Sequence, residues 1–284
     1  MAKDYRVFFH VIQHFSPPGA GSHVCASTLF SAALARQSEK VAKVLVVDGS
    51  KASDPVFAER VRELGADYLH DGRELTFAQG YNLGLAQSDQ AWTILSASDI
   101  YPSLELFEVL AGLCSNPPDP KVGCVIPRLN RVDLSLQESG RDHTGARIVL
   151  PLMTLNLNAF PTDYLRMIGG IPEILSGNYN DVLLAHRIAQ DNREILLAPV
   201  DCLHFGSLTL KSGTSNVSYE RDLALFSSRF PDLHRQGDYW NIDLGRFTRD
   251  KRLRLLSRLA GLLPKKRRWR DIERAMQRIL RPGS

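Results

Sequence analysis

The residues best placed to do chemistry, by type and spacing, lie in the segment Asn178–Arg187. Asp181 stands where an amphipathic helical pattern begins. The partial positive charge of a helix N-terminus favours the charged form of a carboxylate. A carboxylate held in this way can act as a general base that removes a proton from a hydroxyl group. The alternative is an ordinary helix cap, because Asp is favoured at that position.

Four more residues with catalytic or metal-binding side chains follow apolar runs that predict strands. They are Asp48, Asp71, Asp99 and His204. In α/β sheets, ligands bind at the carboxyl ends of the parallel strands. We therefore expect a binding site where these strands end. For His204, a purely structural role after a strand is the alternative.

The elements that must position these residues are predicted by alternating apolar runs and amphipathic patterns, which are typical of βαβ units. Strands are expected at residues 6–12, 42–48, 66–70, 91–95, 122–126 and 194–199, and in a run that ends at 204. Helices are expected at residues 23–37, 54–64, 76–86 and 104–113, with another beginning near 181. The sequence therefore predicts an α/β fold with a Rossmann-like sheet flanked by helices.

Three segments resemble motifs of the family-2 inverting glycosyltransferases, which have the GT-A fold. Residues 46–50 resemble the V-D-D/N-G-S turn, residues 76–86 the helix motif G-x-x-x-A-x-N-x-G-x-x-x-A, and residues 180–187 the segment E-D-x-D-L-x-x-R. The matching positions include Asp48, Asn82, Gly84, Asp181 and Arg187. The resemblance covers about residues 5–210 and implies a GT-A type nucleotide-diphospho-sugar transferase fold, a mixed sheet flanked by helices.

The resemblance also implies roles for these residues. Asp181 would deprotonate the acceptor hydroxyl as that oxygen attacks the anomeric carbon of a nucleotide sugar, in a single inverting displacement. Asp48 would read the base of the nucleotide, while Gly49 and Ser50 allow the backbone a tight turn. Gly84 would permit a close helix–sheet approach. The other donor-binding residues expected are Asp71, Asn82, Gly84, Asp99 and Arg187.

The sequence departs from the family at the D-x-D motif, which binds a divalent cation in metal-dependent members. Asp99, with Pro102 downstream, matches the second acid, but the first acid would fall on Ala97, or on Ser96 if the register shifts by one residue. Asp99 and His204 are therefore the expected metal ligands, for Mg²⁺ or Mn²⁺ held together with the phosphates of the donor. A metal-independent enzyme is the alternative.

The charge of the chain is divided unevenly. Residues 251–284 carry twelve Lys or Arg and two Asp or Glu, although the net charge of all 284 residues is only +4. Leu and other apolar residues recur at helical spacing through 251–263. We expect a catalytic domain at 1–215 and a helical C-terminal extension at 216–284 that ends in a basic amphipathic tail. Such a tail is typical of contact with an anionic membrane surface.

Two other interpretations of the tail remain open. Its apolar face could pack on the catalytic domain, or its charge could bind nucleic acid. No apolar run approaches the ~20 residues that span a bilayer. The four cysteines show no C-x-x-C spacing, so we expect no zinc site and a reducing compartment. The expected location is cytoplasmic, peripheral on the inner face of a membrane.

Three functions follow from this sequence. The first is a glycosyltransferase that uses a nucleotide-sugar donor and a glycan or lipid-linked acceptor. The second is a non-catalytic nucleotide-sugar-binding module, which the missing first acid and Asn180 would explain. The third is the same transferase acting on nucleic acid. Release of nucleotide diphosphate separates the first from the second, and binding to liposomes or DNA tests the third.

Overall fold

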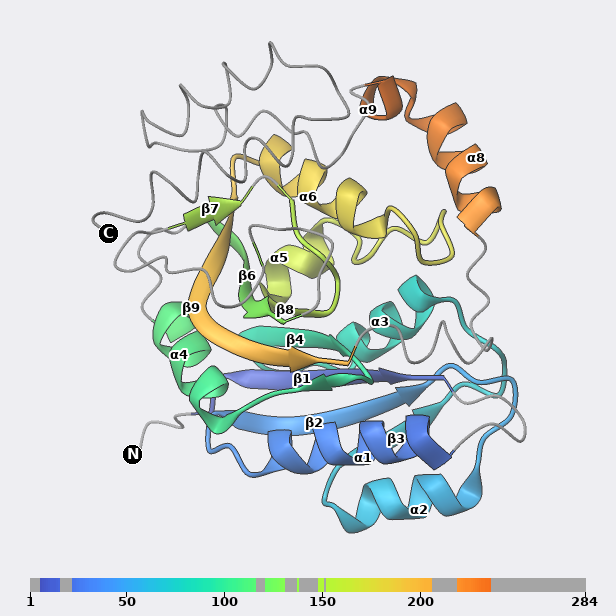
Figure 1. The fold of residues 1–284 in the computed structure, drawn as a ribbon, viewed down its shortest axis with the longest axis vertical. Helices are drawn as coiled ribbons and strands as arrows, with labels where there is room; N and C mark the ends of the chain where they lie inside the picture. Colours follow the sequence, from blue (N-terminus) through green and yellow to red (C-terminus); the bar gives the residue numbers. More distant parts are fainter. Residues whose placement is uncertain are drawn as a thin grey trace, which may run out of the picture.

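A computed structural model gives the fold of the chain (Figure 1). It describes residues 6–15, 22–115, 121–130, 137, 148–150, 152–205 and 219–235. The basic tail at 251–284 lies outside these residues. Among the helices that are described, none is long and apolar enough to cross a membrane.

The first half of the chain alternates strands and helices, as its sequence pattern predicts. The strands are β1 Phe8–His14, β2 Val41–Asp48, β3 Asp67–His70, β4 Trp92–Ala97 and the short β5 Ile100–Tyr101. The helices are α1 Ser22–Arg36, α2 Pro55–Glu63, α3 Phe77–Ala86 and α4 Leu104–Ser115. The strand β5 has no counterpart in the sequence prediction, because two residues are too few to show a period.

The second half supplies the remaining elements. Its strands are β6 Val122–Leu129, β7 Ile148–Leu150, β8 Leu157–Pro161 and β9 Glu194–His204. Its helices are α5 Thr162–Met167, α6 Asn180–Gln190, α8 Tyr219–Arg229 and α9 Pro231–Arg235. The two strands expected at 194–199 and before 204 are one continuous strand, β9. Its pairing with β6 shifts register between Leu197 and Asp201, around the exposed Pro199.

These strands form one mixed sheet in the order β3-β2-β1-β4-β8-β6-β9-β5, with β7 paired to β9. The strands β1 to β4 run parallel, as do β6 and β9, whereas β8 is antiparallel to both of its neighbours. The strands β1, β2 and β9 all point to the right in Figure 1, the side on which the segment that leads into α6 also lies. The predicted α/β fold with a mixed sheet is confirmed.

Helices cover both faces of the sheet, and a separate apolar core fills each side. One core joins β1 to α3, α5 and α6, through residues such as Val11, Tyr81 and Leu184. The other joins the opposite face to α1, α2 and α4, through Ile12 and Phe107 among others. Every residue of β1 is buried, as expected for a central parallel strand with both faces covered.

Two histidines of β1 lie buried on the α1 side of the sheet. His10 Nε2 is 2.7 Å from Ser96 Oγ, and His14 Nδ1 is 2.8 Å from Thr28 Oγ1. Burial lowers the pKa of His10 to about 3 and that of His14 to about 4. Both imidazoles are therefore neutral at pH 7, and each pairs with a hydroxyl group that ties β1 to a neighbouring element.

Local sequence signals fix where the first helices begin. Asp54 accepts hydrogen bonds from the N–H groups of Val56 and Phe57 and caps α2. Thr76 and Gln79 form a reciprocal capping box at the start of α3. Each cap satisfies backbone donors that the first helical turn leaves unpaired. These two helices accordingly begin within a residue of where the sequence predicts.

The helix α3 packs unusually close to β1. A Cβ built on Gly84 would lie within 2.9 Å of both Val11 methyl carbons, and one on Gly80 within 2.9 Å of the Gln13 side chain. The predicted role of Gly84 in a close helix–sheet approach is confirmed. Because Val11 is fully buried in the core, it has no free space into which it can move.

We expect Gly84→Ala to lower the free energy of unfolding by about 1–3 kcal/mol, the usual cost of overpacking a core. Urea unfolding monitored by circular dichroism measures this change. The matched control is Gly112→Ala in α4, where nothing lies within 4 Å of the added Cβ. The free energy of unfolding of that variant should rise by about 0.5–1 kcal/mol, because Ala has a higher helix propensity than Gly. Equal effects of the two substitutions would contradict the packing argument.

Candidate active site

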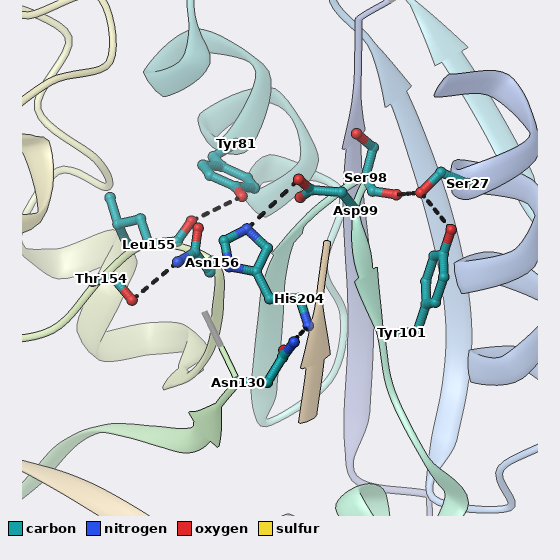
Figure 2. A network of polar contacts seen from close by, with 10 residues as sticks. All are labelled: Ser27, Tyr81, Ser98, Asp99, Tyr101, Asn130, Thr154, Leu155, Asn156 and His204. Atoms are coloured by element: carbon teal, nitrogen blue, oxygen red, sulfur yellow. Dashed lines mark hydrogen bonds and ion pairs between the residues drawn. The ribbon is translucent and has the colours of Figure 1, made fainter. Parts of the chain in front are cut away.

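The site centres on Asp99 and His204, which the fold brings together from distant parts of the chain (Figure 2). Asp99 lies in the turn between β4 and β5, and His204 is the last residue of β9. Asp99 Oδ2 is 3.6 Å from His204 Nε2, and both side chains are largely buried. The short β5 pairs Ile100 with His204, so the β5–β9 ladder sets this distance.

Hydrogen bonds from three directions hold the turn that carries Asp99. The Phe205 N–H donates to the Asp99 carbonyl oxygen at 3.0 Å. From α1, Ser27 Oγ donates to the Ser98 carbonyl oxygen at 2.7 Å and accepts from the Tyr101 hydroxyl at 3.1 Å. The Ala97 N–H donates to the Asn156 carbonyl oxygen at 2.8 Å. The position of Asp99 is therefore fixed before any ligand binds.

A polar segment borders this pair on the side of α3. Figure 2 shows Thr154, Leu155 and Asn156 beside Tyr81 and His204. The Tyr81 hydroxyl donates to the Leu155 carbonyl oxygen at 3.4 Å, and Asn156 Nδ2 donates to Thr154 Oγ1 at 3.2 Å. Burial, with the charge of Asp99 second, raises the pKa of Tyr81 well above its usual value. The Tyr81 hydroxyl group is therefore neutral beside Asp99 (Figure 2).

Few side chains at this site are suited to bind a metal ion. A carboxylate suits Mg²⁺ or Mn²⁺, whereas an imidazole suits Mn²⁺ better than Mg²⁺, which prefers oxygen ligands. Ligand atoms around such an ion lie roughly 3 Å apart, a little less than the 3.6 Å between Asp99 Oδ2 and His204 Nε2. Within the described residues, no group of three or more His, Cys, Asp or Glu side chains could hold a metal ion. The two residues thus fit a cation only if its other coordination positions are filled by a ligand or by water.

The turn after β2 holds the second predicted carboxylate. Asp48 is buried, and its Oδ1 accepts from the Ser50 N–H at 2.9 Å while its Oδ2 accepts from the Tyr68 hydroxyl at 2.5 Å. Burial and then the hydrogen bond to Asp48 raise the pKa of Tyr68. A Cβ on Gly49 would lie within 2.9 Å of the Phe15 ring, so a larger residue there would have to displace that ring. Tyr68 is a partner that the sequence analysis missed.

Asp181 lies in the first turn of α6, as expected from the sequence. Its side chain is partly buried, and its Oδ1 accepts from the Val182 N–H at 2.9 Å. Asn180 beside it is fully buried, and neither of its amide atoms has a hydrogen-bond partner in the described structure. A partly exposed carboxylate at a helix start is accessible to an incoming hydroxyl group.

A chain of backbone contacts connects the Asp48 turn to the segment before Asp181. The Leu75 N–H donates to the Gly49 carbonyl oxygen at 3.0 Å, just before α3 begins. The Phe77 N–H then donates to the Ser176 carbonyl oxygen at 3.1 Å. The start of α3 therefore lies between the Asp48 turn and the segment before Asp181. It brings the turn expected to bind the donor and the segment expected to position the acceptor to one edge of the site.

Three other predicted donor-binding residues have visible structural partners. Asn82 accepts from the Ile171 N–H at 2.7 Å and donates to the Ile171 carbonyl oxygen and to Glu173. Asp71 forms an exposed ion pair with Arg73 at 2.7 Å. Gly84, as shown above, is a packing residue of α3. A direct role for any of the three in donor binding stays a prediction.

Arg187 lies away from the other predicted residues. It is in the last turn of α6, six residues after Asp181, which is roughly 9 Å along a helix axis. Its guanidinium is half exposed and pairs with Asp191 at 3.1 Å. Asp191 also accepts a hydrogen bond from the Tyr164 hydroxyl at 3.1 Å. The structure does not group Arg187 with Asp99 and His204.

Comparison with known proteins supports the fold. No protein-family model matches the chain, and no curated protein matches its sequence. Among solved structures, GalNAc-T7 with UDP, GalNAc and Mn²⁺ is similar with a TM-score of 0.56 and 14% identity, over 70% of this chain and 43% of that one. The chain thus spans less than half the length of that protein.

Two further structures align over more of their length. A mannosyltransferase from Pyrobaculum calidifontis in complex with GDP-Man and Mn²⁺ has a TM-score of 0.56 and 18% identity, over 92% of this chain and 77% of that one. TarS from S. aureus has a TM-score of 0.51 and 15% identity, over 92% of this chain and 85% of that one. At such identities the similarity shows the fold, which is the predicted GT-A fold of nucleotide-sugar transferases.

The contacts of Asn82 lead to a stability prediction. We expect Asn82→Ala to lower the free energy of unfolding by about 2–3 kcal/mol, because it leaves both backbone polar groups of Ile171 without their partner. Urea unfolding measures the change. Gln87→Ala, at the exposed end of the same helix, is the control and should stay within about 0.5 kcal/mol of the parent. A neutral Asn82→Ala would show that these bonds contribute nothing to the turn.

Proposed function

We propose that the chain is an inverting glycosyltransferase that moves a sugar from a nucleotide-diphosphate sugar to a hydroxyl group of a saccharide or a lipid-linked glycan. The observation that carries this proposal is the pairing of Asp99 with His204 at the carboxyl end of β4. The fold adds support, because two similar structures contain UDP or GDP-Man together with Mn²⁺.

The Asp48 turn is the proposed site for the base of the nucleotide. A carboxylate has about four acceptor positions, and Tyr68 and Ser50 use two of those on Asp48. Another can accept a hydrogen bond from a ring N–H of the base. Because both present partners are fixed, the carboxylate is already oriented when the donor arrives, which lowers the entropy cost of binding.

Asp99 and His204 are the residues that would hold Mg²⁺ or Mn²⁺ beside the diphosphate. A divalent cation at this place would neutralise charge on the departing nucleotide diphosphate. The side chains themselves supply a fixed acceptor and a fixed imidazole within a mostly buried setting. Ala97, on the strand side of the turn, contributes no ligand, so binding of the cation depends on the donor phosphates.

Asp181 is the proposed general base. It accepts the proton of the acceptor hydroxyl while that oxygen bonds to the anomeric carbon. The bond from this carbon to the diphosphate oxygen breaks on the opposite face, which inverts the configuration. No covalent intermediate with the protein is needed, and the nucleotide diphosphate leaves with the bonding electrons.

Two other functions remain as alternatives. Ala97 in place of the first acid and the neutral Asn180 favour a non-catalytic module that binds nucleotide sugars. The basic residues at 251–284 favour either an acceptor at an anionic membrane surface or nucleic acid itself as the acceptor. The tail lies outside the described residues, so its membrane contact and a peripheral cytoplasmic location stay predictions, as do the boundaries at 1–215 and 216–284.

Incubation with a panel of nucleotide sugars and saccharide acceptors tests the proposal. We expect release of nucleotide diphosphate with one donor, together with a glycosylated product of inverted configuration by NMR. Asp181→Asn should lower kcat by about 10²–10⁴-fold, the usual contribution of a positioned acid–base group. Asp163→Asn, an exposed acid in the first turn of α5, is the matched control and should keep full activity.

The outcomes separate the alternatives. Binding of a nucleotide sugar without turnover would favour the non-catalytic module. Turnover that Asp181→Asn leaves unchanged would exclude Asp181 as the base. A product with retained configuration would exclude a single displacement.

A separate prediction concerns the divalent cation. Activity should fall by at least about tenfold in excess chelator and return with Mn²⁺ or Mg²⁺, because the cation contributes several kcal/mol of charge stabilisation. His204→Ala should raise the Mn²⁺ concentration needed for half-maximal rate, and calorimetry should show weaker Mn²⁺ binding in the presence of nucleoside diphosphate. Exposed His186→Ala is the control. Full activity in chelator would show that the site works without metal.

A further inference from the structure

A buried carboxylate outside the predicted site holds the segment that leads to Asp181. Asp222 lies in the first turn of α8 and is fully buried. Its Oδ1 accepts from the Ser176 N–H at 2.8 Å. Its Oδ2 accepts from Ser176 Oγ at 2.9 Å, Gly177 N–H at 3.1 Å, and Asn178 N–H and Nδ2 at 2.9 and 3.2 Å. One side chain thus binds three successive residues.

A second contact from the same helix holds the next residue. The Tyr179 ring stacks on the Phe226 ring with centroids 4.8 Å apart and 11° between planes, and its hydroxyl donates to the Tyr219 hydroxyl at 3.1 Å. Tyr179 has a φ of 64°, in the left-handed region that bulky residues rarely adopt. Such a conformation persists only where the surroundings enforce it, and here those surroundings include α8.

The N-cap position of α6 carries no polar capping residue. Tyr179 occupies its N-cap position and makes no capping hydrogen bond with its side chain. Most helices fix their first turn through a polar cap, as α2 and α3 do. In α6 the neighbouring helix α8 takes that role, since it holds each residue from 176 to 179. Asp181 follows two residues later.

We propose that Asp222 is a positioning residue of the transferase site, which fixes residues 176–178 and thereby sets where Asp181 meets the acceptor hydroxyl. The inference rests on the proposed function, because it acts through Asp181. A carboxylate suits this role, since it accepts hydrogen bonds at both oxygens and donates none. Negative charge also suits the N-terminal turn of a helix, where Asp222 lies.

The test begins with Asp222→Asn, which keeps the shape of the side chain. The new NH₂ group must face either the Ser176 N–H or the cluster of donors now at Oδ2, so the segment shifts. A misplacement of about 1 Å can cost ~10²-fold in rate. We expect kcat to fall by about 10–100-fold while the donor KM changes less than about threefold. Glu220→Gln, exposed in the same helical turn, should leave both unchanged.

A double-mutant cycle distinguishes positioning from a general loss of structure. In the Asp181→Asn background, Asp222→Asn should lower kcat by less than about twofold further, since two residues that act through one step are not additive. Amide hydrogen exchange supplies a readout independent of turnover. The Gly177 and Asn178 N–H groups should exchange at least about tenfold faster in Asp222→Asn than in the parent or in Glu220→Gln.

Each outcome decides the proposal. No turnover by the parent with any nucleotide sugar would refute the proposed function and this inference with it. Parent turnover with an unchanged kcat in Asp222→Asn, additive effects in the cycle, or unchanged exchange would overturn the positioning role alone. If Asp222→Asn does not fold, Ser176→Ala decides, because it removes only the Oγ bond. It should lower kcat by about two- to fivefold, and no change would overturn the proposal.

Discussion

The close packing of α3 on β1 is the constraint on which the arrangement of the site depends. Gly80 and Gly84 let the helix lie directly on the sheet, because a side chain at Gly84 would meet Val11 and one at Gly80 would have to move the Gln13 side chain. The helix α3 also connects the Asp48 turn with the segment before Asp181. The first turn of α3 contacts Ser176, and Thr76, the residue before α3, contacts Gln13. Asn82 binds the turn at Ile171. A shift of α3 would therefore move the Asp48 turn and the segment before Asp181 together.

The polar groups of the site are fixed by their surroundings, which satisfy most of them with named partners. Asp48 is held by Tyr68 and Ser50, and the turn of Asp99 is held from α1 and from β9. Burying a carboxylate is costly unless hydrogen bonds or opposite charges replace its water. The same contacts that make burial tolerable also orient the oxygens. Electrostatic groups oriented in advance need little rearrangement during a reaction, which is how such groups lower a barrier.

Much of the fold could be predicted from the sequence because its signals are local. The alternation of strands and helices, the caps of α2 and α3, and the strand ends at Asp48 and Asp99 are all visible within short windows. Parallel strands then bring their carboxyl ends to one edge by geometry. The start of α6 near Asp181 was predictable for the same reason, because its apolar spacing begins there. The two-residue β5 was not, since its hydrogen bonds to β9 come from far along the chain.

The sequence by itself determined which residue types stand at the strand ends, and with them the fold class. Only the tertiary structure decided which of those residues meet. It paired Asp99 with His204 through the β5–β9 ladder, and it placed Arg187 against Asp191 at the other end of α6 from Asp181. It also showed the five hydrogen bonds of Asp222. The physical reason is that the contacts of Asp99 and Asp222 join segments distant in sequence, and a periodic pattern carries no information about the partner of an element, whereas the Arg187–Asp191 pair is local, four residues apart on one helix.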